Sequence, residues 1–224
     1  TRGRTGGRFS YFGLKQNLED LGVNLWGRHQ YRNAAVALAA VELLQEQGWP
    51  VPEEAIREGL AGVRWPGRLE RLAQDPRVIL DGAHNPAAAR SLAQALKNQR
   101  LPGRRYLVIG IMADKDIHDI LESLLPLAQT VIFTRPRYFR AAPPEDLARR
   151  AAPYRLEVLV EPEVSRAVRR ARTLAGPQDQ VVVTGSLYTV GEALEYFEQV
   201  EAEGRKLPTP VTPPTFQETP AKVV

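Results

Sequence analysis

The sequence contains no cysteine, and this absence removes three classes of chemistry at once. Without thiols the chain has no disulfide, no thiolate metal site and no cysteine nucleophile. Histidine is nearly as scarce, and because His29, His84 and His118 lie far apart in the sequence, no metal site is predicted. No apolar run approaches the ~18 residues of a membrane span, and no signal peptide opens the chain. A cytoplasmic protein that does not bind a membrane is therefore expected.

Methionine and lysine are also rare. The only methionine is Met112 and the chain begins at Thr1, which predicts a piece of a longer protein. Five of the 30 basic residues are lysine, so arginine carries most of the positive charge, and the formal net charge is +4. The composition, 43% hydrophobic and 25% charged, is that of an ordinary globular chain. A length of 224 residues suffices for one large domain with a smaller one beside it.

Residues 68–203 alternate between short apolar runs and amphipathic stretches. The runs are apolar throughout, as in Tyr106-Leu107-Val108-Ile109 and Val181-Val182-Val183. Strands of this kind must be covered on both faces. The sequence therefore predicts an α/β fold with a Rossmann-like, mainly parallel sheet and helices on both faces. The predicted strands are 69–73, 77–81, 105–111, 130–134, 157–160 and 180–184, and the predicted helices are 86–99, 117–125, 144–152, 164–174 and 187–203.

The two ends of the chain differ from this pattern. Residues 1–66 combine a glycine- and arginine-rich start with an alanine-rich helix from Asn33 to Gln47 and a shorter helix from Pro52. Because two helices bury too little surface to stand alone, this part is interpreted as a helical remnant of a preceding domain. Proline and threonine dominate residues 206–224, which are predicted to be a flexible tail. The expected domains are 1–66, 67–205 and 206–224.

Polar residues follow several of the predicted strands. In an open α/β sheet, ligands bind at the carboxyl ends of the strands, where the strand order reverses. Each segment also has a structural interpretation, with Asp81 and Asn85 as helix caps and Gly185-Ser186 as a strand-to-helix turn. Together they predict a site for a small zwitterion or a nucleotide ribose. The segments are Asp81-Gly82-Ala83-His84-Asn85-Pro86, Asp114-Lys115-Asp116, Thr134-Arg135-Pro136 and Thr184-Gly185-Ser186.

Three motifs in a fixed order carry a resemblance to a known family. They are Gly27-Arg28-His29-Gln30 with Asn33-Ala34-Ala35, then Trp65-Pro66-Gly67-Arg68, then Asp81-Gly82-Ala83-His84-Asn85-Pro86, with Lys115-Asp116 and Gly185-Ser186 extending the match. Residues 20–200 resemble the folylpolyglutamate synthase / dihydrofolate synthase family of the Mur ligase superfamily. The similarity covers the last helices of the family's central ATPase domain and its Rossmann-like C-terminal domain, with Trp65-Pro66-Gly67 as the hinge. The third motif points to the folate branch over the peptidoglycan ligases.

The resemblance implies an ATP-dependent carboxylate–amine ligase of folate biosynthesis and polyglutamylation. A folate or dihydropteroate carboxylate is phosphorylated, and the amine of L-glutamate then displaces phosphate. ATP and Mg²⁺ are the implied cofactors, with the metal ligands in an N-terminal portion. By position, Asn33, Arg68 and Asp81 are implied at ATP, His84 and Ser186 near glutamate, and Lys115 as a loop contact. No catalytic residue is assigned within this segment.

The phosphate loop of that family has no counterpart here. No glycine is followed directly by a lysine, so the pattern G-x-x-x-x-G-K-[ST] is absent. Without that cradle the segment is expected to be inactive alone and to depend on a missing N-terminal ATPase domain, within a monomeric parent. One alternative is another amino-acid ligase of the same superfamily. The other is a basic nucleic-acid-binding module built on Arg166, Arg169, Arg170 and Arg172 and on Arg135–Arg140, against which the small net charge argues.

Overall fold

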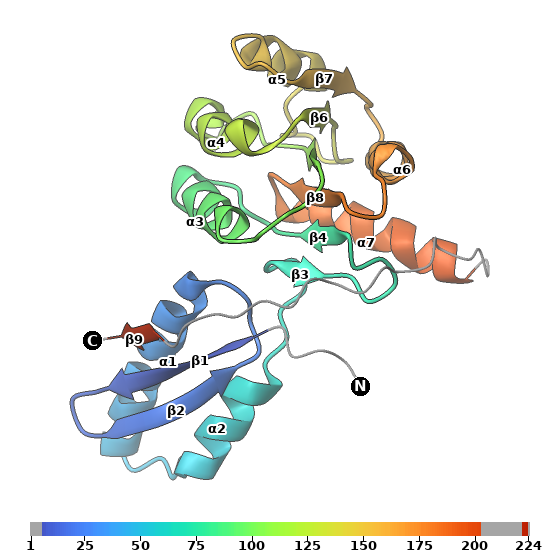
Figure 1. The fold of residues 1–224 in the computed structure, drawn as a ribbon. Helices are drawn as coiled ribbons and strands as arrows, with labels where there is room; N and C mark the ends of the chain where they lie inside the picture. Colours follow the sequence, from blue (N-terminus) through green and yellow to red (C-terminus); the bar gives the residue numbers. More distant parts are fainter. Residues whose placement is uncertain (1–5, 203–220, 224) are drawn as a thin grey trace. The chain divides into compact units, whose positions relative to one another are not determined.

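The computed structural model describes residues 6–202 and 221–223 and divides them between two units (Figure 1). The boundary lies between Pro66 and Gly67, inside the segment Trp65-Pro66-Gly67. The larger unit begins at Gly67, and the smaller one contains the residues before it together with the strand β9 (Ala221–Val223). Each unit is considered by itself below.

The larger unit is an α/β sandwich. Its strands are β3 (Glu70–Arg71), β4 (Val78–Leu80), β5 (Arg105–Ile109), β6 (Thr130–Phe133), β7 (Glu157–Val160) and β8 (Gln180–Thr184). Its helices are α3 (Pro86–Lys97), α4 (Ile117–Leu124), α5 (Pro144–Ala151), α6 (Val164–Leu174) and α7 (Leu187–Ala202), with a 3₁₀ turn η1 (Leu125–Leu127). The sheet order is β3-β4-β8-β5-β6-β7, and β3 pairs antiparallel with β4 while the other pairs are parallel. This confirms the predicted fold class.

The sheet is covered on both faces because its central strands have no polar side. Every residue of β4, β5, β6 and β8 is buried. Helices α3, α4 and α5 cover one face, and α6 and α7 cover the other (Figure 1). β8 lies between β4 and β5, but the helix that follows β8 covers the opposite face from those that follow its neighbours. The strand order therefore reverses beside β8, which is where a ligand crevice is expected.

The sequence predicted helices alone before Gly67, but the smaller unit also contains strands. It contains an antiparallel hairpin, β1 (Gly7–Phe12) and β2 (Asn17–Val23), packed with α1 (Arg28–Glu46) and α2 (Glu53–Gly62). No strand was predicted in the glycine- and arginine-rich start, and for residues 7–23 this was wrong. An irregular register between Phe9 and Tyr11 breaks the pairing, and the inward residues of β2 are separated by three positions and then two. The period-two pattern that marks a strand was thereby hidden.

The predicted tail falls mostly outside the described residues. Of residues 206–224, the structure describes Ala221–Val223, which form β9 and pair in parallel with β1. The expectation of a flexible tail does not hold for these three residues. Strand pairing at a sheet edge uses backbone groups, so it needs no side-chain signal that composition could reveal.

One side chain holds the hairpin turn onto α1. The carboxylate of Glu42 accepts hydrogen bonds from the backbone N–H groups of Leu14, Lys15 and Gln16, at 3.1, 3.3 and 3.2 Å. Burial alone would raise the pKa of Glu42, but these N–H groups lower it below its ordinary value. The smaller unit thus has its own polar lock in addition to its apolar core.

A buried ion triad ties the β3–β4 turn to α6. The Asp75 carboxylate has an exposed fraction of 0% and accepts from Arg77 at 2.8 Å and from Arg172 at 3.1 Å. Arg77 also donates to the carbonyl oxygen of Ala175 at 2.8 Å. Burial alone would raise the pKa of Asp75, yet its hydrogen bonds to the two guanidinium groups keep it below its ordinary value.

We expect Asp75→Asn to lower the free energy of unfolding by about 3 kcal/mol at pH 7, because two buried guanidinium groups lose their counter-charge. The folded-state pKa of Asp75 is depressed, so its stabilisation is complete above the unfolded value of 3.8 and is lost as pH falls through the folded value. Urea unfolding at pH 7 and at pH 3 measures both effects. Asp146→Asn, which removes an exposed pair with Arg149, is the control and should change stability little. Equal losses in the two variants would contradict the expectation.

Candidate functional site

Backbone hydrogen bonds join the loops at the carboxyl edge of the sheet beside β8. The N–H of Gly82 donates to the carbonyl oxygen of Gly67 at 2.8 Å, which ties the β4–α3 loop to the start of the larger unit. The N–H of Gly110 donates to Thr184 at 3.2 Å, which ties the end of β5 to the end of β8. These segments therefore form one connected edge, at the point where the strand order reverses.

Asp81 is the central residue of this edge. Its side chain is buried, one oxygen accepting from the N–H of Leu69 and the other from the N–H of Ala83, each at 2.9 Å. Leu69 has φ +48°, a left-handed conformation that a branched side chain rarely adopts. Burial raises the pKa of Asp81 to about 6, although both N–H groups and the charges of Arg68 and His84 oppose the rise. The carboxyl group thus holds the backbone of the residue that follows Arg68 and of the residue that precedes His84.

Arg68 has a backbone that is held in place and a side chain whose charge acts on the nearby carboxyl group of Asp81. It lies between Gly67, whose φ is +71°, and the clamped Leu69. Its side chain is half-buried, and among residues 6–202 it makes no hydrogen bond or ion pair. A guanidinium group held in this way offers parallel N–H donors to an anion such as phosphate or carboxylate.

His84 has one nitrogen committed and one available. Its Nδ1 lies 2.8 Å from the carbonyl oxygen of Gly82. Because a carbonyl oxygen only accepts hydrogen bonds, Nδ1 must carry the proton and Nε2 is left for a ligand. The neighbouring Asn85 caps α3, its side-chain oxygen accepting from Ala88 N–H at 2.9 Å, which confirms the structural interpretation of Asn85. Asp81 does not cap that helix.

Ser186 is buried, and its hydroxyl group is largely used by α7. Its Oγ accepts from the N–H of Thr189 at 3.0 Å and lies 2.8 Å from Oγ1 of Thr189, which itself donates to the carbonyl oxygen of Gly110 at 2.9 Å. The hydroxyl proton of Ser186 therefore goes to Thr189. A ligand could reach only the remaining lone pair of Ser186 or its backbone. The preceding Gly185 has φ +103°, and a Cβ there would lie 2.6 Å from the oxygen of Gly110, so the turn requires glycine.

The edge brings some of the predicted residues together and not others. A Cβ on Gly82 would lie 2.4 Å from the Leu187 side chain, so the loop of Asp81 and His84 is adjacent to the turn of Ser186. Lys115 follows β5 and its Nζ lies 3.6 Å from Asp114. Asn33 belongs to the smaller unit, where its side chain donates to Gln30 at 2.9 Å.

An exposed aromatic cluster follows the ends of β6 and β8, and sequence reasoning did not assign it to the site. The rings of Tyr138 and Tyr188 stack with centroids 4.0 Å apart, and Arg140 lies 5.3 Å from the Tyr138 centroid. Phe139 beside them is 82% exposed. The available signal was Tyr188, which lies two positions after the predicted site residue Ser186, in the first turn of α7. Aromatic rings at this position offer an apolar and stacking surface.

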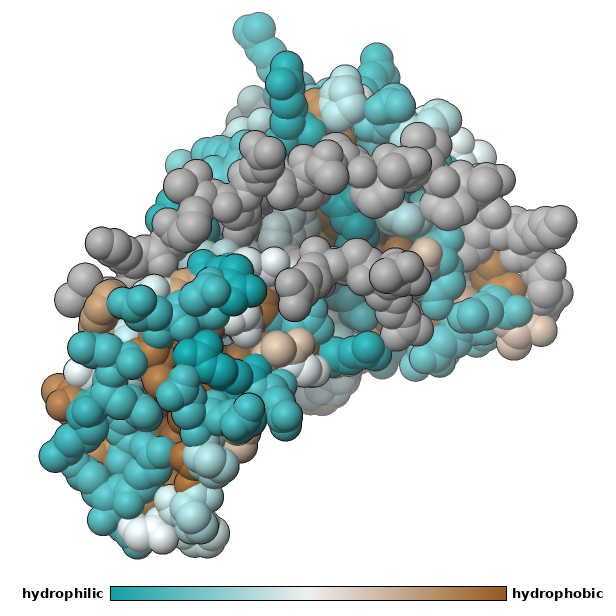
Figure 2. Space-filling model, turned by 60° about the horizontal axis from the view of Figure 1, so that its bottom comes forward, coloured by the Kyte–Doolittle hydropathy of each residue, from teal (hydrophilic) through white to brown (hydrophobic). Residues whose placement is uncertain are grey.

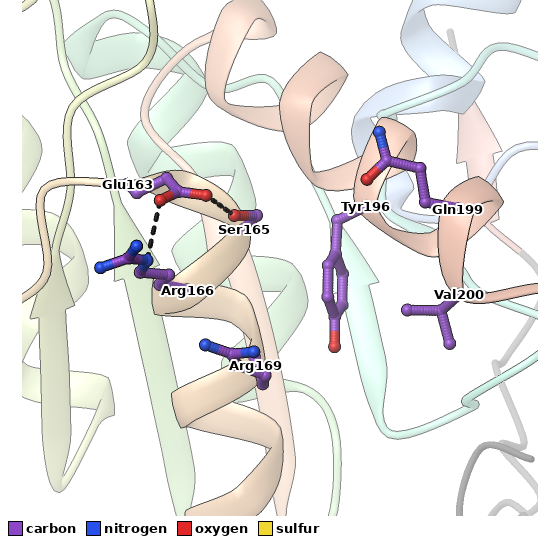
Figure 3. A pocket seen from close by; sticks show the side chains of 7 residues that line it. All are labelled: Glu163, Ser165, Arg166, Arg169, Tyr196, Gln199 and Val200. Carbon is purple, nitrogen blue, oxygen red and sulfur yellow. Dashed lines mark hydrogen bonds and ion pairs between the residues drawn. The ribbon is translucent and has the colours of Figure 1, made fainter. Parts of the chain in front are cut away.

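The arginines of α6 do not all face solvent. Arg172 is turned inward to the buried carboxylate described above, and Arg166 pairs with Glu163 at 2.8 Å. Arg169 and Tyr196 line a groove of about 280 Å³ between α6 and α7, shown in Figure 3. Nucleic-acid binding needs several cations that face a common backbone. Nothing in the described residues favours that alternative.

Metal and membrane functions receive little support from the described residues. Ligand atoms of His118, Asp119 and Glu122 lie within 4.8 Å of one another, at spacings that one helix turn provides. They come from one surface of α4 and leave most of a coordination shell unfilled, so we assign them no metal role. None of the helices described here combines the length and apolarity needed to span a bilayer.

A mainly parallel sheet that is covered on both faces and presents a guanidinium, an imidazole and two glycine turns at its carboxyl edge is typical of a Rossmann-like domain. The model of the family "Mur ligase, glutamate ligase domain" matches residues 67–187, and the chain belongs to this family. The curated relatives show which members of this family the chain is similar to. The folylpolyglutamate synthase of Lacticaseibacillus casei is 34% identical over 82% of this chain and 42% of its own length, and the dihydrofolate synthase/folylpolyglutamate synthase of Bacillus subtilis is 30% identical over 84% and 43%.

Solved structures agree with the sequence relatives. The Mycobacterium tuberculosis folylpolyglutamate synthase complexed with ADP has a TM-score of 0.79 and 33% identity, over 86% of this chain and 45% of that one. A bifunctional synthase from Yersinia pestis complexed with AMPPNP and a Mn ion has a TM-score of 0.69 and 30% identity, over 83% and 42%. The chain thus spans less than half the length of these relatives and matches their C-terminal part.

We expect Asp81→Asn to destabilise the fold, because an amide has one acceptor oxygen where the carboxyl group serves two backbone N–H groups. The folded-state pKa of Asp81 is raised to about 6, so the folded protein binds the proton more tightly than the unfolded chain. Wild-type stability from this group therefore falls as pH rises from about 4 to about 6, and the difference between wild type and variant should shrink over that range. Urea unfolding at half-unit pH steps measures it. A difference that grows with pH would show that the pKa is not raised.

Proposed function

We propose that this chain is the C-terminal part of an ATP-dependent folylpolyglutamate / dihydrofolate synthase, which joins L-glutamate to a folate or dihydropteroate carboxylate through an acyl phosphate. The supporting observation is the edge at β8. There the family match coincides with an Arg68 side chain that makes no hydrogen bond or ion pair within residues 6–202 and with His84, whose Nδ1 is committed to Gly82. The curated relatives cited above are folate ligases, which favours this substrate class over that of other Mur-type ligases.

Each residue of the edge has a separate part in the proposal. Arg68 binds the phosphate groups of the nucleotide when the domain it begins closes over the preceding one. His84 binds the incoming glutamate. Ser186 binds it as well, through the remaining lone pair of its hydroxyl group or through its backbone. Asp81 holds Arg68 and His84 in register through its two backbone hydrogen bonds. Lys115 provides a further loop contact at the same edge.

ATP fits the described residues in part, and Mg²⁺ does not fit Asp81. The free guanidinium of Arg68 suits a phosphate, and Asn33 is proposed to contact the adenine. Asp81 is unsuited to a metal because both of its oxygens accept backbone bonds and burial raises its pKa. We therefore propose that the phosphate loop and the Mg²⁺ ligands lie in an N-terminal ATPase domain of the parent, which acts as a monomer in the cytoplasm.

The 224-residue chain alone should not catalyse ligation. It lacks the backbone cradle and lysine that position the transferred phosphoryl group. Purified chain mixed with ATP, Mg²⁺, glutamate and tetrahydrofolate should release no phosphate above a protein-free control. The chain carries only part of the proposed nucleotide site, so ATP should bind it weakly. Because a ligand stabilises a fold only to the extent that it binds, ATP at micromolar concentration should shift the melting temperature little. Glutamate-dependent phosphate release would overturn this expectation.

In the longer parent enzyme, Arg68→Gln should reduce kcat/KM by about 100-fold, because one charged donor to the reacting phosphates is removed. His84→Ala should instead raise KM for glutamate by about tenfold, the loss of one hydrogen bond to a charged group. Steady-state kinetics with ATP and glutamate varied separately distinguishes the two effects. Arg64→Gln, at an exposed position four residues before Arg68, is the matched control. A similar loss in all three variants would argue against these roles.

A further inference from the structure

The groove between α6 and α7 is lined by residues that have no part in the proposed ligase. Its volume is about 280 Å³, and Figure 3 shows the side chains that surround it. Hydrophilic residues predominate on the face of the molecule drawn in Figure 2, so a polar lining alone does not mark a binding site. Whether the groove can bind a ligand depends on which of its hydrogen-bonding groups are already used within the fold.

The only carboxylate among the described residues that line the groove is fully used. One oxygen of Glu163 lies 2.8 Å from Nε of Arg166, and the other accepts a hydrogen bond from the hydroxyl group of Ser165. Arg166 therefore balances the charge of Glu163. The second arginine of the groove, Arg169, makes no ion pair within residues 6–202, so the lining carries a net positive charge.

Tyr196 has a hydroxyl proton that it can donate. Its oxygen accepts a hydrogen bond from Arg172 at 2.9 Å, because an arginine side chain can only donate. The phenol proton itself has no acceptor among residues 6–202. Arg172 is in turn held by the buried carboxylate of Asp75, at 3.1 Å. The Tyr196 hydroxyl group is therefore held in place before any ligand binds.

Arg169 lies across the groove from Tyr196 and is equally available. It is exposed, and its side chain makes no hydrogen bond or ion pair within residues 6–202. Figure 3 shows Arg169 on α6 opposite the Tyr196 ring on α7. Gln199, three residues after Tyr196, also lines the groove, and its amide has no partner in the same part of the chain. The unused groups of the groove are thus mainly N–H and O–H donors.

We propose that the groove binds an oxyanion, a carboxylate or a phosphate group, held between Arg169 and Tyr196. A guanidinium group presents two parallel N–H donors, which match two oxygens of one anion. The Tyr196 hydroxyl group supplies a third donor from the other helix, so the ligand is held from both sides of the groove. This site is independent of the proposed function, since none of its residues is assigned to ATP, glutamate or folate.

Arg169 and Arg170 provide a matched pair of variants for the test. Both are exposed and adjacent on α6, but of the two only Arg169 lines the groove. The isotope-labelled 224-residue chain and its Arg169→Gln and Arg170→Gln variants are titrated with sodium phosphate and, separately, with glutarate. Sodium chloride keeps the ionic strength constant, so that screening is the same at every point. NMR shifts of the backbone amides of residues 165–170 and 196–200 give Kd.

We expect saturable shifts in the wild-type chain. Arg169→Gln should raise Kd at least about tenfold, because hydrogen bonds from a charged donor are lost. Arg170→Gln should change Kd less than about twofold, since an exposed charge outside the groove contributes little. Tyr196→Phe keeps the ring and should raise Kd about threefold, the loss of one neutral donor. Dispersed spectra and unchanged unfolding temperatures establish that the variants are folded.

The two anions identify the source of the oxyanion. Saturation by phosphate alone, by glutarate alone or by both would support the site and show which oxyanion it prefers. The absence of a saturable shift with either anion would overturn the proposal. An equal weakening in the Arg169 and Arg170 variants would overturn it as well, because the anion would then respond to the charge of α6 and not to the groove.

Discussion

The geometry of the carboxyl edge depends on one carboxyl group that bridges two stretches of backbone. Asp81 accepts a hydrogen bond from the N–H of Leu69, twelve residues earlier in the sequence, and another from the N–H of Ala83, two residues later. The left-handed conformation of Leu69 costs about 1–2 kcal/mol, an amount that its hydrogen bond to Asp81 can offset. Burial of the carboxyl group has its own cost, visible as a pKa raised to about 6. The protein thus accepts a poorly solvated acid in order to fix a loop.

This constraint also orders the backbone around Arg68. A long cationic side chain on a free loop would sample many positions and lose entropy on binding an anion. Here the residues on both sides are held, by the Gly82–Gly67 hydrogen bond and by the Asp81–Leu69 hydrogen bond. The backbone is therefore ordered before any ligand arrives, and only the side chain remains to be placed.

The parallel sheet could be predicted from the sequence because its strands have no polar side. The buried runs in β5 and β8 admit few other arrangements, and the amphipathic helices between them fix the class. The hairpin β1–β2 could not be predicted in the same way. Its register is irregular, and its turn is held by Glu42, which lies 26 to 28 residues further along the chain. An interaction between a carboxylate and backbone N–H groups leaves no pattern in the residues that supply the N–H groups.

The same limit applies to the site. Motif order selected Arg68, Asp81 and His84, and the structure joins their loops, but the sequence could not show that the Asp81 oxygens are used by backbone N–H groups. The structural use of Ser186 was readable, because a serine just before a helix commonly accepts a hydrogen bond from a backbone N–H of the first turn. The stack of Tyr138 on Tyr188 joins residues 50 positions apart, and no local rule pairs them.

In the proposed ligase, the division of the chain between Pro66 and Gly67 has a chemical use. Arg68 is the second residue of the larger unit, whereas Asn33 belongs to the smaller one, so the two residues proposed to contact the nucleotide belong to separate units. An acyl phosphate is destroyed by water unless the site closes before it forms. A site assembled from two bodies is complete only when they come together, which links phosphate binding by Arg68 to the exclusion of water. In this proposal the hydrogen bonds of Asp81 support closure, since closure can position a guanidinium only if the loop that carries it is held in place.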